Sequence, residues 1–118
     1  MPYRIKIAVA GPYSAPTEIG RQENFNRLNL EAAKLLEAGY IPLIGVNAAL
    51  PVISKSGLKD EYEAIMAISI AVIEQCDAIV MFAESPGALK EKEIFEKNGK
   101  PVFQSAEEAI RYYKEKSE

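Results

Sequence analysis

The sequence predicts a doubly wound α/β fold with a mainly parallel sheet, flavodoxin-like or Rossmann-like, in a single domain over residues 1–118. Three observations support this prediction. Apolar segments of strand length alternate with longer segments of helix length, as in βαβ units. The run from Ala78 to Phe82 is apolar without interruption, which is typical of a parallel strand covered on both faces. The length of 118 residues is enough for one core and too short for two.

The first strand and the first helix have clear limits in the sequence. The strand covers Ile5–Ala10, and residues 13–20 are expected to form a loop. A helix follows and ends near Ala38, with Gly39 in the left-handed conformation after its last turn. One side of this helix carries apolar residues at helical spacing: Phe25, Leu28, Ala32, Leu35 and Leu36.

The middle of the chain contains one short strand and one strongly apolar helix. The strand is predicted over Tyr40–Ile44, and residues 45–59, rich in glycine, proline and serine, are predicted to be mostly loop. Asp60 and Glu63 have the spacing of a capping box, which opens a helix that reaches about Gln75. This helix, residues 60–75, is apolar nearly all round, so we expect a homo-oligomer that forms through it. Its large apolar residues are Ile65, Met66, Ile68, Ile70, Val72 and Ile73.

The last third of the chain repeats the alternation. A strand over Ala78–Phe82 leads into a helix within Ser85–Gly99. A final strand covers Pro101–Phe103, and Ser105 caps a C-terminal helix. Ligands of such sheets bind beyond the carboxyl ends of the strands, so the segments that follow the first and third strands are the places to look for a site.

Composition and charge exclude several classes of function. The net charge is −3 and no strong basic run occurs, so binding to nucleic acid or to an anionic membrane has no electrostatic support. No segment has the length of a signal-peptide core or of a transmembrane helix. Cys76 is the one cysteine, which fits a reducing cytoplasm. There is no histidine, so triad chemistry and the commonest metal ligand are missing. We expect no metal site and no cofactor.

Glu91 is the strongest candidate for a functional residue. At about 100° per residue, it falls between Ala88, Ile94 and Phe95 on the apolar side of its helix. A carboxylate turned toward a core is costly unless it has partners or a task. Two purely structural interpretations stay open. Glu91 is a core acid whose hydrogen bonds are satisfied by a tyrosine or an asparagine, or the helix is rotated so that Glu91 is exposed. Glu93 lies on the charged side and is expected to be solvated.

Two strand ends carry further candidates. Gly11, Pro12 and Tyr13 follow the first strand; glycine permits close approach of a ligand, although a simple turn would explain the same residues. Ser85 is an expected N-cap with a proline after it. Its hydroxyl and the amides of Gly87 and Ala88 could also hold a phosphate or a ribose hydroxyl, although capping alone is a sufficient explanation for Ser85.

Four other residues have mainly structural explanations. Asn24 is most simply a capping or edge residue of the first helix, and Asp77 a turn or capping residue. Ser69 lies on the most apolar side of its helix, where a serine by default bonds back to its own helix carbonyl. Cys76 is expected to be a buried, inert thiol.

Taken together, these residues resemble the nucleoside 2-deoxyribosyltransferase superfamily, especially its small, poorly characterised branch. The resemblance also extends to deoxynucleoside monophosphate N-glycosidases. It covers most of the chain in the same order and spacing: Ile7 to Ser14, Asn24, Leu36 to Tyr40, Cys76 to Val80, the pattern Ser85-x-Gly87-Ala88-x-x-Glu91, and Gly99 to Val102.

The resemblance implies a role for each matching residue. The glutamate at the position of Glu91 is the family's nucleophile: it attacks C1′ of a 2-deoxynucleoside, the base leaves, and a second base or water then takes the sugar. A serine at the position of Ser85 is typical of relatives that act on nucleoside monophosphates. One departure concerns leaving-group activation, because Ser69 stands where active members carry an acid. The usual glycines near the glutamate are also replaced, by Leu89 and Glu93.

The sequence therefore predicts an N-glycosidic enzyme that acts on a nucleoside or nucleotide, with a 2-deoxynucleoside 5′-monophosphate as the expected substrate. Glu91 is the expected catalytic residue, and Ser69 and Asp77 are supporting candidates. The expected substrate-binding residues are Gly11, Pro12, Tyr13, Asn24, Ser85, Gly87 and Ala88. The alternatives are a nucleotide-binding module with little or no catalysis and a structural α/β protein without a small ligand.

Overall fold

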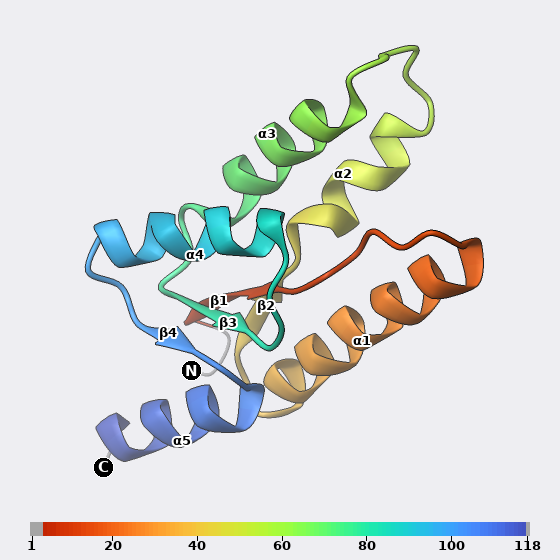
Figure 1. The fold of residues 1–118 in the computed structure, drawn as a ribbon. Coiled ribbons are helices and arrows are strands. Elements are labelled where there is room, and N and C mark those ends of the chain that lie inside the picture. Colours follow the sequence, from red (N-terminus) through yellow and green to blue (C-terminus); the bar gives the residue numbers. More distant parts are fainter. Residues whose placement is uncertain (1–3, 118) are drawn as a thin grey trace.

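A parallel sheet forms the centre of the fold in residues 4–117, the part of the chain that the computed structural model describes (Figure 1). In that range its strands are β1 (Lys6–Ala10), β2 (Ile41–Leu43), β3 (Ala78–Met81) and β4 (Val102–Phe103). They lie in the order β2-β1-β3-β4, and each neighbouring pair is parallel. The register aligns Ala10 with Met81, so β1 and β3 end at the same edge of the sheet.

Helices cover both faces of this sheet, which confirms the predicted doubly wound α/β fold. Within the same residues they are α1 (Glu18–Glu37), α2 (Gly45–Ile53), α3 (Glu61–Ile73), α4 (Pro86–Lys97) and α5 (Ala106–Ser117). Figure 1 shows α1 and α5 on one face and α4 with the end of α3 on the other. Alternate residues of β1 serve the two faces: Ile7 and Val9 pack with α1, whereas Ala8 and Ala10 pack with α4.

The α4 face of the sheet is built from small side chains near the site. Ala8 and Ala10 of β1 and Ala88 of α4 are all buried in one cluster, and Phe95 fills the same cluster further along the helix. Since interiors are close-packed, small side chains let the first turn of α4 lie close to the ends of β1 and β3. This packing brings the N-terminus of α4 to the carboxyl edge of the sheet.

The prediction that residues 45–59 are mostly loop is wrong for residues 45–53, which form α2. Gly45, Ala49 and Ile53 are buried at helical spacing, and α2 packs along α3. Gly45 serves this packing: a Cβ atom there would lie 2.5 Å from the Cβ of Ser69. Pro51 lies in the last turn, where one missing N–H is the main loss. Tertiary packing therefore outweighs the turn-forming residues.

The start of α1 differs from the sequence prediction, whereas the expected caps of the other helices are present. α1 begins at Glu18, earlier than the predicted loop over 13–20 allowed, because the Thr17 hydroxyl accepts a hydrogen bond from the Gly20 N–H at 3.0 Å. Asp60 caps α3 by accepting from the Glu63 N–H at 3.3 Å, as predicted. The predicted left-handed Gly39 has a φ of 98°. The Ser105 hydroxyl likewise accepts from the Glu108 N–H at 3.1 Å.

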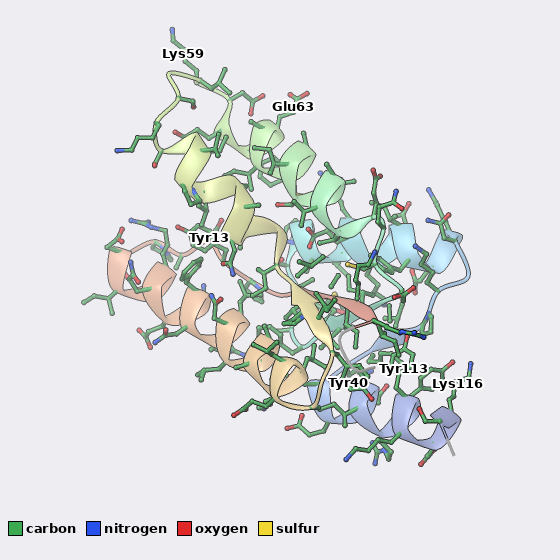
Figure 2. The ribbon with its side chains drawn as sticks, turned by 180° about the vertical axis from the view of Figure 1, so that it is seen from behind. Tyr13, Tyr40, Lys59, Glu63, Tyr113 and Lys116 are labelled. Carbon is green, nitrogen blue, oxygen red and sulfur yellow. The ribbon has the colours of Figure 1, made fainter. Side chains whose placement is uncertain are left out.

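Helices α2 and α3 and their connection, residues 45–73, form an arm that projects from the sheet (Figure 1). Lys59 marks the tip of this arm in Figure 2. The arm gives the molecule its elongated shape, 49 × 29 × 24 Å. Much of α3 stays partly accessible, and Tyr62 is 50% exposed. None of the helices in residues 4–117 is both long and apolar enough to cross a membrane.

Candidate active site

A cavity of about 690 Å³ opens at the carboxyl edge of the sheet. It lies where β1 and β3 end side by side. The chain leaves β1 toward α1 on one face and leaves β3 toward α4 on the other, so the strand order reverses at this point. Open α/β sheets bind their ligands at such a switch point, and the volume is in the range of small-molecule sites.

The loop after β1 forms one wall of the cavity. Gly11, Pro12 and Tyr13 all line it, as predicted for the strand end. Gly11 also has a packing role, because a Cβ atom there would lie 2.6 Å from the Phe82 ring. Asn24 does not line the cavity; its side-chain amide donates to the carbonyls of Tyr13, at 3.1 Å, and Ser14, at 3.2 Å. Asn24 therefore fixes the position of the loop that carries Tyr13.

Tyr13 lies between the start of α1 and the arm, as Figure 2 shows. Its ring packs edge-on against Phe25, with centroids 6.2 Å apart and an interplanar angle of 77°. The cavity also reaches Arg21, whose guanidinium donates to the Ala15 carbonyl at 3.1 Å and to the Glu18 carboxylate at 2.7 Å. This end of the cavity thus combines an aromatic ring with a cation that has partners of its own.

The first turn of α4 forms the opposite wall. Ser85 is the N-cap: its hydroxyl oxygen accepts from the Ala88 N–H at 3.1 Å. The Ala88 amide, a predicted ligand donor, is therefore already occupied by the cap. The Gly87 N–H has no acceptor among residues 4–117 and is the free backbone donor of this turn. Ser85, Gly87 and Ala88 all line the cavity, so the hydroxyl and one amide are available to an anion there.

Glu91 lies one turn further along α4 and lines the same cavity. Its carboxyl group is partly buried, and burial raises its pKa to about 7 from an ordinary 4.5. Within the described part of the chain no hydrogen bond or ion pair reaches this group. Neither structural alternative for Glu91 fits, because its carboxyl group has no hydrogen-bond partner in residues 4–117 and is not fully exposed to solvent. Glu93, by contrast, is exposed and pairs with Lys97 at 2.8 Å.

Ser69 is the most buried polar residue of the cavity lining in residues 4–117. It is 1% exposed, and its hydroxyl has no hydrogen-bond partner in residues 4–117. The default bond back to its own helix is therefore not made. A buried polar atom without a partner costs free energy, so this hydroxyl is a group that a ligand could satisfy.

Asp77 and Cys76 lie away from the cavity, at the amino end of β3. The Asp77 carboxylate accepts from the Lys6 N–H at 2.9 Å, and the Asp77 N–H donates to the Lys6 carbonyl at 2.8 Å. Asp77 therefore has a structural role, as expected for a turn or capping residue. It lies at the opposite edge of the sheet from Glu91. Cys76 is fully buried, and burial raises its pKa to about 11. The expected burial of this thiol is confirmed.

Apart from Ser69, sequence reasoning missed the residues that the arm and α1 contribute to the cavity. The arm adds an apolar wall on which a flat ring can pack: Val46, Leu50, Ile53, Tyr62, Ile65 and Met66. Residues 46, 49, 50 and 53 have the spacing of one helix face, which was the available signal. Lys90 of α4 links the two sides at the rim: its ammonium donates to the Tyr62 hydroxyl at 3.2 Å.

The cavity offers a defined set of chemical groups. One partly buried, unpaired carboxylate lies beside a hydroxyl and a free amide, and an apolar wall faces them. A carboxylate in such surroundings can act as a nucleophile or as a base. The hydroxyl and the amide can bind an anionic or hydroxylated group of the same ligand.

Comparison with known protein families gives a match over most of the chain. A family model described as "Domain of unknown function (DUF4406)" matches residues 5–104, which include every residue of the cavity. No curated protein matches the chain.

Proposed function

The chain belongs to the DUF4406 family, and we propose that it cleaves or transfers the N-glycosidic bond of a nucleoside or nucleotide. The observation that carries the proposal is Glu91, an unpaired carboxylate in a cavity at the switch point of the sheet. The resemblance of the Ser85-to-Glu91 pattern to nucleoside 2-deoxyribosyltransferases supports the same chemistry. The proposed substrate is a 2-deoxynucleoside 5′-monophosphate.

In the proposed reaction a Glu91 oxygen attacks C1′ of the sugar. The bond between C1′ and the base nitrogen breaks, and the electron pair of that bond leaves with the base. Water or a second base then attacks C1′ of the glycosyl-enzyme and frees the carboxylate, in the two-step manner of retaining glycosidases.

The cavity walls suggest how the substrate lies. The Ser85 hydroxyl and the Gly87 amide would hold the 5′-phosphate at the helix N-terminus. The base would then lie between Tyr13 and the apolar wall of the arm, because aromatic and aliphatic side chains there can pack on a flat ring.

Release of free base from a panel of deoxynucleoside monophosphates tests the proposal. We expect Glu91→Gln to lower kcat/KM by at least roughly 10³-fold, as when other catalytic units lose a member. Glu93→Gln is the matched control, since it alters the same residue type two positions away on the exposed side of α4. Base release that persists in Glu91→Gln would remove Glu91 from the role of nucleophile.

A second candidate function is a nucleotide-binding module with little or no catalysis. One observation favours it: Ser69, and not an acid, lies at the deep end of the cavity. Thermal shift separates the two candidates, because a ligand stabilises the protein that binds it. Stabilisation by nucleotides without any base release would favour the binding module.

We also propose that the protein assembles with itself through α3. Ile68 and Val72 are only partly buried and do not line the cavity, so they form an apolar stripe on α3 that a second copy would cover. Light scattering tests this proposal: Ile68→Glu is expected to yield monomers, and a wild-type protein that is monomeric would contradict it.

A further inference from the structure

The cavity contains the proposed nucleophile but only weak proton donors near it. The chain has no histidine. Among the residues described as cavity lining, the most buried polar group is the Ser69 hydroxyl, an alcohol. Glu61 is exposed on the first turn of α3, away from the buried end of the cavity. Tyrosine hydroxyls, such as those of Tyr13 and Tyr62, are weak acids in general.

This arrangement matters because an ordinary nucleoside has a neutral base. When the bond from C1′ breaks, such a base leaves as an anion unless an acid protonates it. General acid catalysis is typically worth about 10²–10⁴-fold in rate. A site without a strong acid loses that factor for neutral bases, but it loses nothing for a base that leaves in neutral form.

The surroundings of Glu91 favour a cationic ligand. Its carboxylate has no cation beside it in residues 4–117, and a desolvated negative charge gains much from a positive partner. Tyr13 lines the same cavity, and aromatic faces attract cationic rings. The ring of Tyr62 already has a cation over it, because the Lys90 ammonium lies 5.0 Å from its centroid. The Met66 sulfur lies near the first turn of α4, 3.3 Å from where a Cβ on Gly87 would be, and adds a polarisable surface.

We propose that the preferred substrate is a 5′-mononucleotide with a cationic heteroaromatic base, such as a pyridinium or an N7-alkylated purine. This inference rests on the proposed N-glycosidic function and names its substrate class. A Glu91 oxygen bonds to C1′, the bond from C1′ to the ring nitrogen breaks, and its electron pair neutralises the positive ring. The base leaves without a proton. Water then hydrolyses the glycosyl ester, and one proton passes to solvent.

A matched pair of substrates tests the inference in the full-length protein. The probes are 2′-deoxyguanosine 5′-monophosphate and its N7-methyl derivative, which differ by one methyl group and one positive charge. Base release is measured by chromatography, and the rate without protein is subtracted. We expect kcat/KM for the methylated nucleotide to be at least about 100-fold higher, the smallest typical contribution of a general acid, and to depend on Glu91.

Binding provides a second measurement that needs no turnover. Nicotinamide mononucleotide carries a pyridinium ring, and its reduced form carries a neutral ring of nearly the same shape. We expect the wild-type protein to bind the cationic form at least about 10-fold more tightly, and Glu91→Gln to remove this preference. A double difference of this kind isolates the charge interaction.

The outcomes separate the inference from the function on which it rests. Release of the base from both nucleotides, guanine from one and 7-methylguanine from the other, with kcat/KM values within about 10-fold of each other, would overturn the cationic preference and leave the N-glycosidic function standing. Equal affinity for the two nicotinamide nucleotides would also overturn the preference. If no nucleotide of the panel is cleaved or bound, the proposed function itself fails, and the inference fails with it.

Discussion

Polar groups at the two edges of the sheet differ in whether they have hydrogen-bond partners. At the amino edge, Asp77 and Lys6 exchange two hydrogen bonds, and the Lys100 ammonium donates to the carbonyls of Glu74 and Cys76. At the carboxyl edge, the carboxylate of Glu91 and the hydroxyl of Ser69 have no partner within residues 4–117. Buried polar groups in native proteins are normally paired. The unpaired groups thus concentrate at the edge where doubly wound sheets bind ligands.

The packing of aromatic side chains also differs between the two edges. Tyr40 precedes β2, and its ring packs against that of Tyr113 in α5, with centroids 5.7 Å apart. Figure 2 shows this pair far from Tyr13. Burial raises the pKa of Tyr113 to about 12, as expected for a phenol in a packed cluster. Tyr13 instead lines an open cavity. The aromatic rings at the amino edge are therefore packed against each other, whereas the carboxyl edge holds an open cavity.

The largest expected effect concerns Glu91, whose pKa in the folded protein is about 7 compared with an ordinary 4.5. The folded state therefore favours the protonated acid. The contribution of Glu91 to stability is most favourable below pH 4.5 and falls as the pH rises toward 7. We expect Glu91→Gln to raise the free energy of unfolding at pH 8 by up to about 3 kcal/mol, and to leave it nearly unchanged near pH 4.

Urea denaturation of the wild type and Glu91→Gln at the two pH values measures this difference. Glu93→Gln serves as the control, since its exposed side chain pairs only with Lys97 in the described chain, and little change is expected at either pH. A Glu91→Gln protein less stable than the wild type at pH 8 would mean that the carboxylate has a stabilising partner after all. The contrast between the edges would then be lost.

A smaller effect is expected at Gly45, where α2 and α3 meet. A Cβ atom there would lie 2.5 Å from the Cβ of Ser69, so Gly45→Ala must push the helices apart. Overpacking of this kind costs about 1–3 kcal/mol. Gly57→Ala is the control, because a Cβ atom there has nothing within 4 Å. Thermal melting of both variants checks the prediction, and equal stability would show that the contact between the helices yields easily.

The smallest effect is expected at the amino edge itself. Asp77→Ala removes the carboxylate that accepts from the Lys6 N–H, and one such hydrogen bond contributes about 1 kcal/mol. Asp77→Asn keeps an acceptor oxygen and should lose less. Because Asp77 is remote from the cavity, nucleotide-induced stabilisation should be the same in both variants as in the wild type. An Asp77→Ala protein that folds normally but no longer responds to nucleotide would connect the two edges functionally.

Local signals predicted most of the fold. The alternation of apolar strands with capped helices gave the parallel sheet, and Asp60, Ser85 and Ser105 cap the helices at which they were expected. The loop predicted over residues 45–59 was wrong for residues 45–53, because glycine and proline were interpreted there as turn formers. Gly45 is instead required by the close approach of Ser69, and this long-range contact leaves no mark in the local sequence.

The candidate site was predictable to a similar extent. Glu91, Ser85 and the loop after β1 all line one cavity, as expected from the helix periodicity and the strand ends. Ser85 occupies the Ala88 amide, so the free donor of that turn is Gly87. The contributions of Arg21 and of the arm depend on how distant elements pack, and the pattern of one element alone does not contain that information.

The arm has a consequence for how this family can diversify. The arm supplies one wall of the cavity, yet it projects from the sheet, and its two helices pack mainly on each other. Exchanges at Leu50 or Ile65 can thus reshape the cavity while the surroundings of Glu91 and Ser85 on α4 stay unchanged. For the proposed function, ligand preference can thus change in the arm separately from the proposed nucleophile on α4.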